Sequence, residues 1–207
     1  MPLDPTRVAI FHITPVSNLA GIIEQGGLYS DAALAHHPHD VIGYSHIKQR
    51  RLTEYRIGCC DNRFVGEFVP FYYCPRSPML YTINRGNTGK PPGSQRDILH
   101  LVSSVATAMT LGRPWAISDG NAGAAHALFS SDIAQLDALD WDAIRTARWA
   151  GKTHQKSAEF LVADFFPWTA IQSIGCYDDN VGAQVQHIIA NVPHQPEVRA
   201  QRGWYYS

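Results

Sequence analysis

One segment constrains this chain more than any other, the run Val-Pro-Phe-Tyr-Tyr-Cys-Pro-Arg-Ser-Pro-Met-Leu-Tyr at positions 69–81. Its first half is apolar and aromatic, the pattern of a buried strand. It then reaches a Pro-Arg-Ser-Pro corner, where two prolines fix φ and hold the intervening residues extended. The corner presents Arg76 and Met79 beside an aromatic surface, which suits a nucleotide or an unpaired base. The alternative is an irregular core strand followed by a proline turn.

Length and composition predict a globular protein. A chain of 207 residues can bury one sizeable core, and its length favours one or two domains. No run of about 18 apolar residues is present, so we expect no membrane span. The first residues, Met-Pro-Leu-Asp-Pro-Thr-Arg, have no apolar signal-peptide core, which favours a cytoplasmic location.

The four cysteines give no sign of a metal centre. Cys59 and Cys60 are adjacent, Cys74 and Cys176 stand alone, and no Cys-x-x-Cys occurs. These spacings predict neither a zinc site nor a disulfide framework. We therefore expect reduced thiols and no metal.

The net charge of -1 hides a local excess of basic residues. Between Lys48 and Arg96 there are nine Lys or Arg and three acidic residues, whereas from residue 101 onward there are seven basic and ten acidic ones. Such a basic stretch in a near-neutral protein is compatible with a groove for a polyanion. Solvated surface charge is the alternative.

The pattern of strands and helices predicts an α+β fold. We expect strands at 8–13, 68–74, 80–84, 99–105, 115–118, 158–163 and 171–177. We expect helices after Thr14-Pro15, over 47–57, after the Asp119-Gly-Asn121 turn, over 141–149 and over 182–190. No regular alternation of strand and helix occurs, which argues against a parallel sheet. The Gly- and Pro-rich residues 85–97 have the composition of a mobile flap.

Four features could meet at a site, and the aromatic strand at 68–74 is one of them. In the basic helix, Lys48 and Arg51 are three positions apart and share a face, whereas Arg50 points away. That pair suits a phosphate or a developing oxyanion, and a solvated helix face is the alternative. His12 lies at the end of the first strand, and Glu159 begins a very apolar strand. Each of these two has an ordinary structural explanation when it is considered alone.

Taken jointly and in order, these segments resemble the DarT family, bacterial toxins that transfer ADP-ribose from NAD to bases of single-stranded DNA. The motifs are Phe11-His-Ile-Thr14, Asn18-Leu19, Ile47-Lys-Gln-Arg-Arg51, the proline corner at 69–81, Ser118-Asp-Gly-Asn-Ala122 and Ala158-Glu-Phe-Leu-Val162. The match runs from about residue 8 to Trp204-Tyr-Tyr206. The resemblance implies one ADP-ribosyltransferase-like domain over 1–207, with a split mixed β-sheet, flanking helices and an NAD-binding cleft between its halves.

The resemblance also implies how NAD+ is held. His12 and Thr14 would hold the adenosine-side ribose, and Tyr72 would pack against the nicotinamide. Asn18 and Leu19 belong to the same NAD+-binding set. Strand alternation supports the placement of Tyr72, because it sends Tyr72 to the side opposite its two neighbours.

The catalytic and DNA-binding roles follow from the same resemblance. Glu159 would be the catalytic acidic residue, and Arg51 the second catalytic residue, which also belongs to the NAD+ site; Arg50 is the competing assignment. The residues expected to contact DNA are Lys48, Tyr73, Arg76 and Met79.

These residue types fit the reaction. Breaking the nicotinamide–ribose bond leaves an oxocarbenium-like ribose, which a carboxylate stabilises. The N3 of thymine is a poor nucleophile until its proton leaves, and Glu159 is a candidate base. Arg51 could stabilise charge on the base carbonyls, worth about 3 kcal/mol if it acts as an oxyanion-hole donor does. Duplex DNA hides the Watson–Crick edge, so a single strand is the expected substrate.

Several alternatives stay open at this stage. The acceptor could be guanine, RNA or protein, although Ser157 stands where protein-modifying relatives often carry Gln or Glu. The chain could also be a single-strand-binding module without catalysis. If the toxin assignment holds, the resemblance implies a cognate macrodomain antitoxin as a partner.

Overall fold

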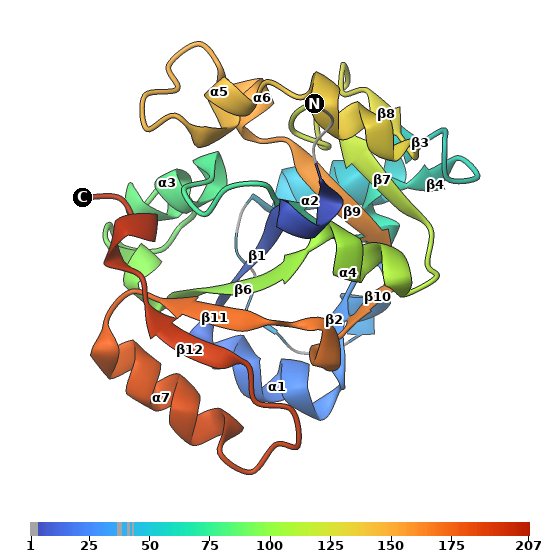
Figure 1. Cartoon of the computed structure of the whole chain (residues 1–207). Coiled ribbons are helices and arrows are strands. Elements are labelled where there is room, and N and C mark those ends of the chain that lie inside the picture. Colours follow the sequence, from blue (N-terminus) through green and yellow to red (C-terminus); the bar gives the residue numbers. More distant parts are fainter. Residues whose placement is uncertain (1–3, 37–38, 41, 43) are drawn as a thin grey trace.

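An eight-stranded sheet forms the centre of the computed structural model, which describes residues 4–36, 39–40, 42 and 44–207 (Figure 1). Its strands, in spatial order, are β12 (Glu197–Ala200), β11 (Ser173–Cys176), β6 (Ile98–Ser104), β1 (Ala9–Pro15), β5 (Phe68–Tyr72), β9 (Glu159–Ala163), β7 (Trp115–Ser118) and β8 (Phe129–Ser130). All neighbours pair antiparallel except β11 and β12, which are parallel, so the sheet is mixed.

Helices and two small sheets surround this central sheet. The helices are α1 (Leu19–Glu24), α2 (Ser45–Thr53), α3 (Pro78–Asn84), α4 (Val105–Thr110), α5 (Trp141–Arg145), α6 (Thr153–Lys156) and α7 (Asp179–Ile189). The small sheets pair β2 (Gly27–Tyr29) with β10 (Phe165–Pro167) and β3 (Arg56–Ile57) with β4 (Arg63–Phe64). Helix α7 packs against β11 and β12, as Figure 1 shows. None of the helices in the described part of the chain is long and apolar enough to cross a membrane.

The central sheet is split between β1 and β5. Strand β1 pairs with β6 along its whole length, but its register with β5 consists of Phe11 opposite Tyr72. The two strands diverge from this contact, so the sheet divides into the halves β12-β11-β6-β1 and β5-β9-β7-β8. Backbone N–H and C=O groups that would pair in a continuous ladder thus have no partner on the facing strand where β1 and β5 diverge, and a ligand can approach them there.

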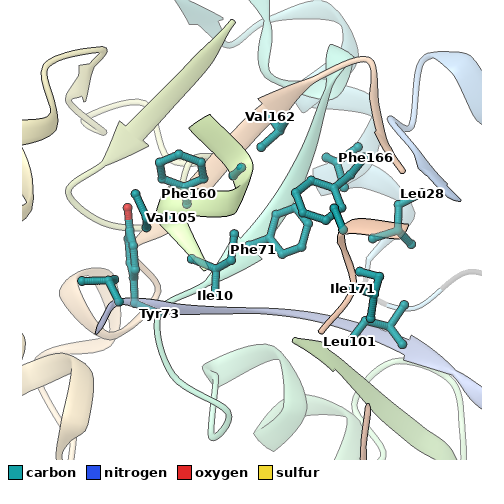
Figure 2. Packing of buried hydrophobic residues seen from close by; sticks show 14 of the residues in the cluster. Ile10, Leu28, Phe71, Tyr73, Leu101, Val105, Phe160, Val162, Phe166 and Ile171 are labelled. Atoms are coloured by element: carbon teal, nitrogen blue, oxygen red, sulfur yellow. The ribbon is translucent and has the colours of Figure 1, made fainter. Parts of the chain in front are cut away.

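Strand alternation sorts the aromatic residues of β5 and its continuation. Phe71 and Tyr73 are buried in the main core, where Phe71 packs against Phe166 with ring centroids 4.7 Å apart (Figure 2). Tyr72 belongs instead to a separate cluster with Leu80 and Ile83 on the other side. The predicted division of these three aromatic residues is confirmed, and it leaves Tyr72 half-buried at the split.

The proline corner starts a helix, so the predicted strand at 80–84 is wrong. Ser77 is extended, and its Oγ accepts a hydrogen bond from the backbone N–H of Leu80 at 3.2 Å. Pro78 takes the first helical position, where a missing N–H costs nothing. The cap and the proline together outweigh the apolar composition that favoured a strand, and α3 follows.

Three other expectations need correction. Thr14-Pro15 does not begin a helix, because β1 continues to Pro15 and α1 starts only at Leu19. The basic helix ends at Thr53, since the chain then forms the β3–β4 hairpin. The Ala-rich segment after Asn121 forms turns: the Asn121 side chain accepts a hydrogen bond from the N–H of Gly123 at 2.8 Å, which competes with a helix.

The C-terminal residues hold the proline corner in place. Tyr205 is fully buried, and its hydroxyl donates to the carbonyl of Ile98 at 2.7 Å. The hydroxyl of Tyr206 donates to the carbonyl of Arg76 at 2.8 Å. Buried His100 lies between them, with Nε2 2.9 Å from the carbonyl of Pro75. These contacts tie β6, the corner and the C-terminal residues into one unit.

We expect His100 to make stability depend on acid pH. Burial lowers its pKa from 6.5 to about 4. The unfolded chain therefore binds the proton first, so stability falls as pH drops from 6.5 towards 4, by roughly 3 kcal/mol for this group. In urea titrations between pH 7 and pH 4, His100→Gln should lose correspondingly less stability than the unaltered chain. The exposed His187→Gln is the control, and equal pH dependence in both variants would contradict the prediction.

Candidate active site

A cleft opens where β1 and β5 diverge. Its cavity of about 190 Å³ is walled by β1, α1, α2, β5 and the first turn of α3. The predicted site residues that line it are His12, Thr14, Asn18, Lys48, Arg51, Tyr72 and Met79. These residues come from four separate stretches of the sequence, and the split in the sheet brings them together. In the described part of the chain, no group of three or more His, Cys, Asp or Glu side chains could hold a metal ion.

A buried ion pair stands at the wall of this cleft. The Arg51 guanidinium meets the Glu159 carboxylate through two hydrogen bonds, Nη1–Oε1 at 3.2 Å and Nη2–Oε2 at 3.0 Å. The side chains are 12% and 2% exposed. Such a bidentate pair fixes both groups in orientation. Burial lowers the pKa of Arg51, but the facing Glu159 carboxylate outweighs it and holds the pKa above its ordinary value, so Arg51 stays charged.

The register of α2 decides which arginine faces the cleft. Lys48 and Arg51 lie on the same face and both line the cavity, which confirms the prediction from their spacing. Arg50 points outward, where it is 48% exposed and pairs with Glu54 at 2.7 Å. The geometry therefore favours Arg51 over Arg50 as the arginine of the site.

The polar surroundings of Glu159 explain how a carboxylate occupies the first position of a buried strand. Its backbone lies opposite Tyr72 on β5, and its N–H donates to Ser118 Oγ at 3.0 Å. The carboxylate also accepts a hydrogen bond from the N–H of Ala122 at 3.1 Å. The two oxygens of the carboxylate thus accept three hydrogen bonds, two from the Arg51 guanidinium and one from the N–H of Ala122. These hydrogen bonds offset the cost of burying the charge.

His12 presents a defined hydrogen-bonding edge to the cleft. Its Nδ1 lies 2.9 Å from the carbonyl of Pro70, which can only accept, so Nδ1 carries the hydrogen. Burial lowers the pKa of His12, so the ring is neutral at pH 7. Nε2 is then an acceptor, suited to a hydroxyl group of a ligand.

Asn18 joins the cleft to the segment at Asp40. Its side chain donates to the carbonyl of Asp40 at 2.9 Å and accepts from the N–H of Asp40 at 2.8 Å. It also donates to Thr14 Oγ1 at 3.3 Å. Asn18 therefore positions part of the cleft wall, a role that its place in a motif did not reveal.

Some predicted residues lie elsewhere. Leu19 is fully buried in the main core and does not line the cleft. Tyr73 and Arg76 line a different cavity, and Tyr73 is only 6% exposed. Lys48 does line the cleft, but it is paired with Asp31 at 2.8 Å. Glu159 does not itself line the cleft, but it is hydrogen-bonded to Arg51, which does.

Sequence reasoning missed an aromatic rim near Met79. Exposed Tyr81 contacts Trp149 and Tyr206, with ring centroids 5.5 and 5.2 Å apart. These rings come from α3, the loop before α6 and the C-terminal residues. A helix at 78–84 would have placed Tyr81 on the same element as Met79, but no pattern signals Trp149. Ala122, whose backbone N–H contacts Glu159, also gives no side-chain signal.

Comparisons with known proteins give matches over almost the whole chain. A family model described as ssDNA thymidine ADP-ribosyltransferase, DarT, matches residues 11–206. A DNA ADP-ribosyl transferase of Thermus aquaticus is 40% identical over 206 residues, which cover 98% of this chain and 90% of that protein. The structure of Thermus sp. 2.9 DarT in complex with ADP-ribosylated ssDNA matches with a TM-score of 0.91 at 37% identity, and that of its complex with NAD+ with a TM-score of 0.88 at 34% identity; both comparisons cover 100% of each chain. The expected α+β fold is confirmed.

We expect the buried pair to be strongly coupled. Arg51→Met should lower the free energy of unfolding by about 3–5 kcal/mol, because Glu159 would stay buried without its counter-charge. Replacing both residues, as Arg51→Met with Glu159→Leu, should recover most of that loss. Urea unfolding of the two single variants and the double variant measures the coupling. Arg50→Met is the matched control and should change stability little, and additive effects at Arg51 and Glu159 would contradict the prediction.

Proposed function

The chain belongs to the DarT family of single-stranded-DNA thymidine ADP-ribosyltransferases, and we propose that its reaction takes place in the cleft between β1 and β5. It is an NAD+-dependent DNA ADP-ribosyltransferase. The observation that carries the placement of the site is the bidentate Arg51–Glu159 pair, buried beside a cavity that His12 and Tyr72 also line.

The cleft residues fit NAD+ as the co-substrate. The neutral His12 ring offers an acceptor for a ribose hydroxyl, and Thr14 lies beside it on β1. Burial raises the pKa of Tyr72, so its phenol stays uncharged and its ring suits the nicotinamide. Arg51 supplies a charge for the pyrophosphate or the reacting base. Leu19 keeps a structural role in this assignment, because it anchors the start of α1 in the main core.

Transfer requires one bond to break and one to form at the same carbon. The bond between ribose C1′ and the nicotinamide nitrogen breaks, and nicotinamide leaves with the bonding electrons. The N3 of thymine then bonds to C1′, and its proton passes to the Glu159 carboxylate. The same carboxylate stabilises the oxocarbenium-like ribose, while Arg51 stabilises charge on the thymine carbonyls. Glu159 and Arg51 are therefore assigned as the catalytic residues.

The surface next to the cleft suits a single strand. Tyr81, Trp149 and Tyr206 form an aromatic cluster on which unpaired bases could stack. Met79 lines the cleft and packs against the same hydrophobic cluster as Tyr206. The guanidinium of Arg76 lies 5.8 Å from the centre of the Tyr206 ring. We propose that DNA enters across this rim. A contact of Lys48 with DNA stays a prediction, and Tyr73 could take part only through the second cavity.

The family assignment supports two further proposals, one for a partner protein and one for the location of the enzyme in the cell. A transferase that modifies DNA bases would damage its own host, which supports a toxin with a cognate macrodomain antitoxin. Because DNA and NAD+ meet in the bacterial cytoplasm, we also propose that the enzyme acts there. A binding module without catalysis is disfavoured, since it would have no use for a buried carboxylate beside a nucleotide cleft.

The direct test is transfer to DNA. Incubation with NAD+ and a short thymine-containing oligonucleotide should add the mass of one ADP-ribose and release nicotinamide. Oligo-dG without thymine should gain nothing. Glu159→Gln should slow transfer by about 10²–10⁴-fold, as expected for loss of a general base, with DNA binding retained. Unmodified oligonucleotide under conditions where NAD+ binds would refute the proposal.

Arg51 and Arg50 provide a matched pair for testing catalysis. Arg51→Ala should lower kcat by about 10²-fold or more, because the lost charge acts mainly in the transition state. Its effect on NAD+ affinity should be smaller. Arg50→Ala should leave both quantities near those of the unaltered enzyme. A loss confined to NAD+ affinity would assign Arg51 to substrate binding alone.

A further inference from the structure

A second, larger cavity lies on the other side of the contact between β1 and β5. Its volume is about 790 Å³, and none of its lining residues lines the cleft. It is walled by the turn before β1, the residues that follow β5, α5 and α6. The family resemblance suggested DNA contacts for two of its lining residues, Tyr73 and Arg76, but it assigns the cavity itself no ligand. Its volume is in the range of small-ligand sites, roughly 300–1,000 Å³.

Lys156, a lining residue, is a buried cation without a counter-charge. It is only 2% exposed, and its Nζ donates to the carbonyl of Ile144 at 2.7 Å. No carboxylate of the described residues lies within ion-pair distance of it. Burying an ammonium is costly unless it is paired. Besides the carbonyl of Ile144, the ammonium interacts with the thiol of Cys74, which burial keeps protonated, so neither partner carries an opposite charge. An anion in the cavity would supply the missing charge.

Two more donors belong to residues that line this cavity. The hydroxyl of Tyr73 and the Nε of Arg76 are both buried and make no hydrogen bond with any residue that the structure describes. In Figure 2 the ring of Tyr73 stands at the edge of the core cluster. Burial raises the pKa of Tyr73 well above its ordinary value, so the hydroxyl keeps its proton and can donate. Unsatisfied buried groups of this kind need an explanation, and a bound ligand provides one.

The basic residues and the indole ring that line the cavity favour a ligand with a phosphate attached to an aromatic ring. Arg7, Arg76, Arg145 and Lys156 line it, against the single carboxylate of Asp4. That carboxylate already accepts hydrogen bonds from Thr6. The ring of Trp141 also lines the cavity, with the guanidinium of Arg145 5.0 Å from its centre. Cations next to an indole ring recognise a nucleotide through its phosphate and its base.

We propose that this cavity binds the phosphate group of a nucleotide. Lys156, Tyr73 and Arg76 donate to the phosphate oxygens, and the base packs against Trp141. The nucleotide is either a flanking residue of the DNA substrate or a free mononucleotide. The site does not depend on the role of Glu159, because the two cavities have separate linings.

The test uses dTMP and thymidine on the full chain carrying Glu159→Gln, so that no transfer occurs. Calorimetry should show dTMP binding at least about tenfold more tightly than thymidine, the increment expected for charge-assisted hydrogen bonds. Tyr73→Phe and Lys156→Met should each weaken dTMP binding by about tenfold. Tyr55→Phe and Lys90→Met, the same substitutions outside the cavity, should bind dTMP unchanged. Equal binding of thymidine, or unchanged binding in the Tyr73→Phe chain, would overturn the proposal.

Tyr73→Phe keeps the test decisive if Lys156→Met fails to fold. It removes one unpaired hydroxyl, so its melting temperature should stay the same or rise. Competition then separates the two sources of the phosphate. If a thymine-containing oligonucleotide displaces dTMP and itself binds Tyr73→Phe more weakly, the cavity holds a flanking DNA nucleotide. If dTMP stays bound, the cavity holds a free nucleotide.

Discussion

The site depends on one interaction, the ion pair between Arg51 and Glu159. The two residues are 108 positions apart, and their contact joins α2 to the first position of β9. A buried pair of this kind adds little net stability, because taking both charges out of water costs about as much as their attraction returns. The pair matters because it fixes the positions of the two groups. The pair holds a carboxylate and a charged guanidinium in fixed orientation and largely shielded from water, at the wall of the cleft in which we propose that glycosidic cleavage takes place.

The split in the sheet gives that pair its setting. Strands β1 and β5 meet at Phe11 and Tyr72 and diverge on both sides of this contact. One divergence holds the cleft lined by His12 and Thr14, and the other borders the cavity lined by Ala9 and Phe11. The same strand therefore serves two hollows of different chemistry. The cleft lining has as many acidic as basic residues, whereas the second cavity gathers cations that pair with no carboxylate of the described residues.

Local sequence patterns predicted which side chains share a face of a helix or strand better than they predicted which residues are in contact. Helical spacing placed Lys48 and Arg51 together, and strand alternation set Tyr72 apart, because both depend only on backbone geometry. The pattern failed at α3, where the Ser77 cap and Pro78 outweighed a strand-like composition. The pairing of Arg51 with Glu159 has no local signal, and the family resemblance assigned the two residues to one site without predicting their ion pair. The exclusion of Leu19 from the cleft and the burial of Tyr73 likewise depend on tertiary packing.

The tyrosine contacts that hold the proline corner can form only after most of the site residues have been translated. Tyr206, whose hydroxyl binds the carbonyl of Arg76, is translated after almost every other residue of the site. A growing chain on the ribosome therefore carries Arg51 long before it carries either Glu159 or this clasp. The proline corner is therefore tied down only after Tyr206 has been made, so a chain that ends before this residue lacks the contact that holds the corner next to the cleft.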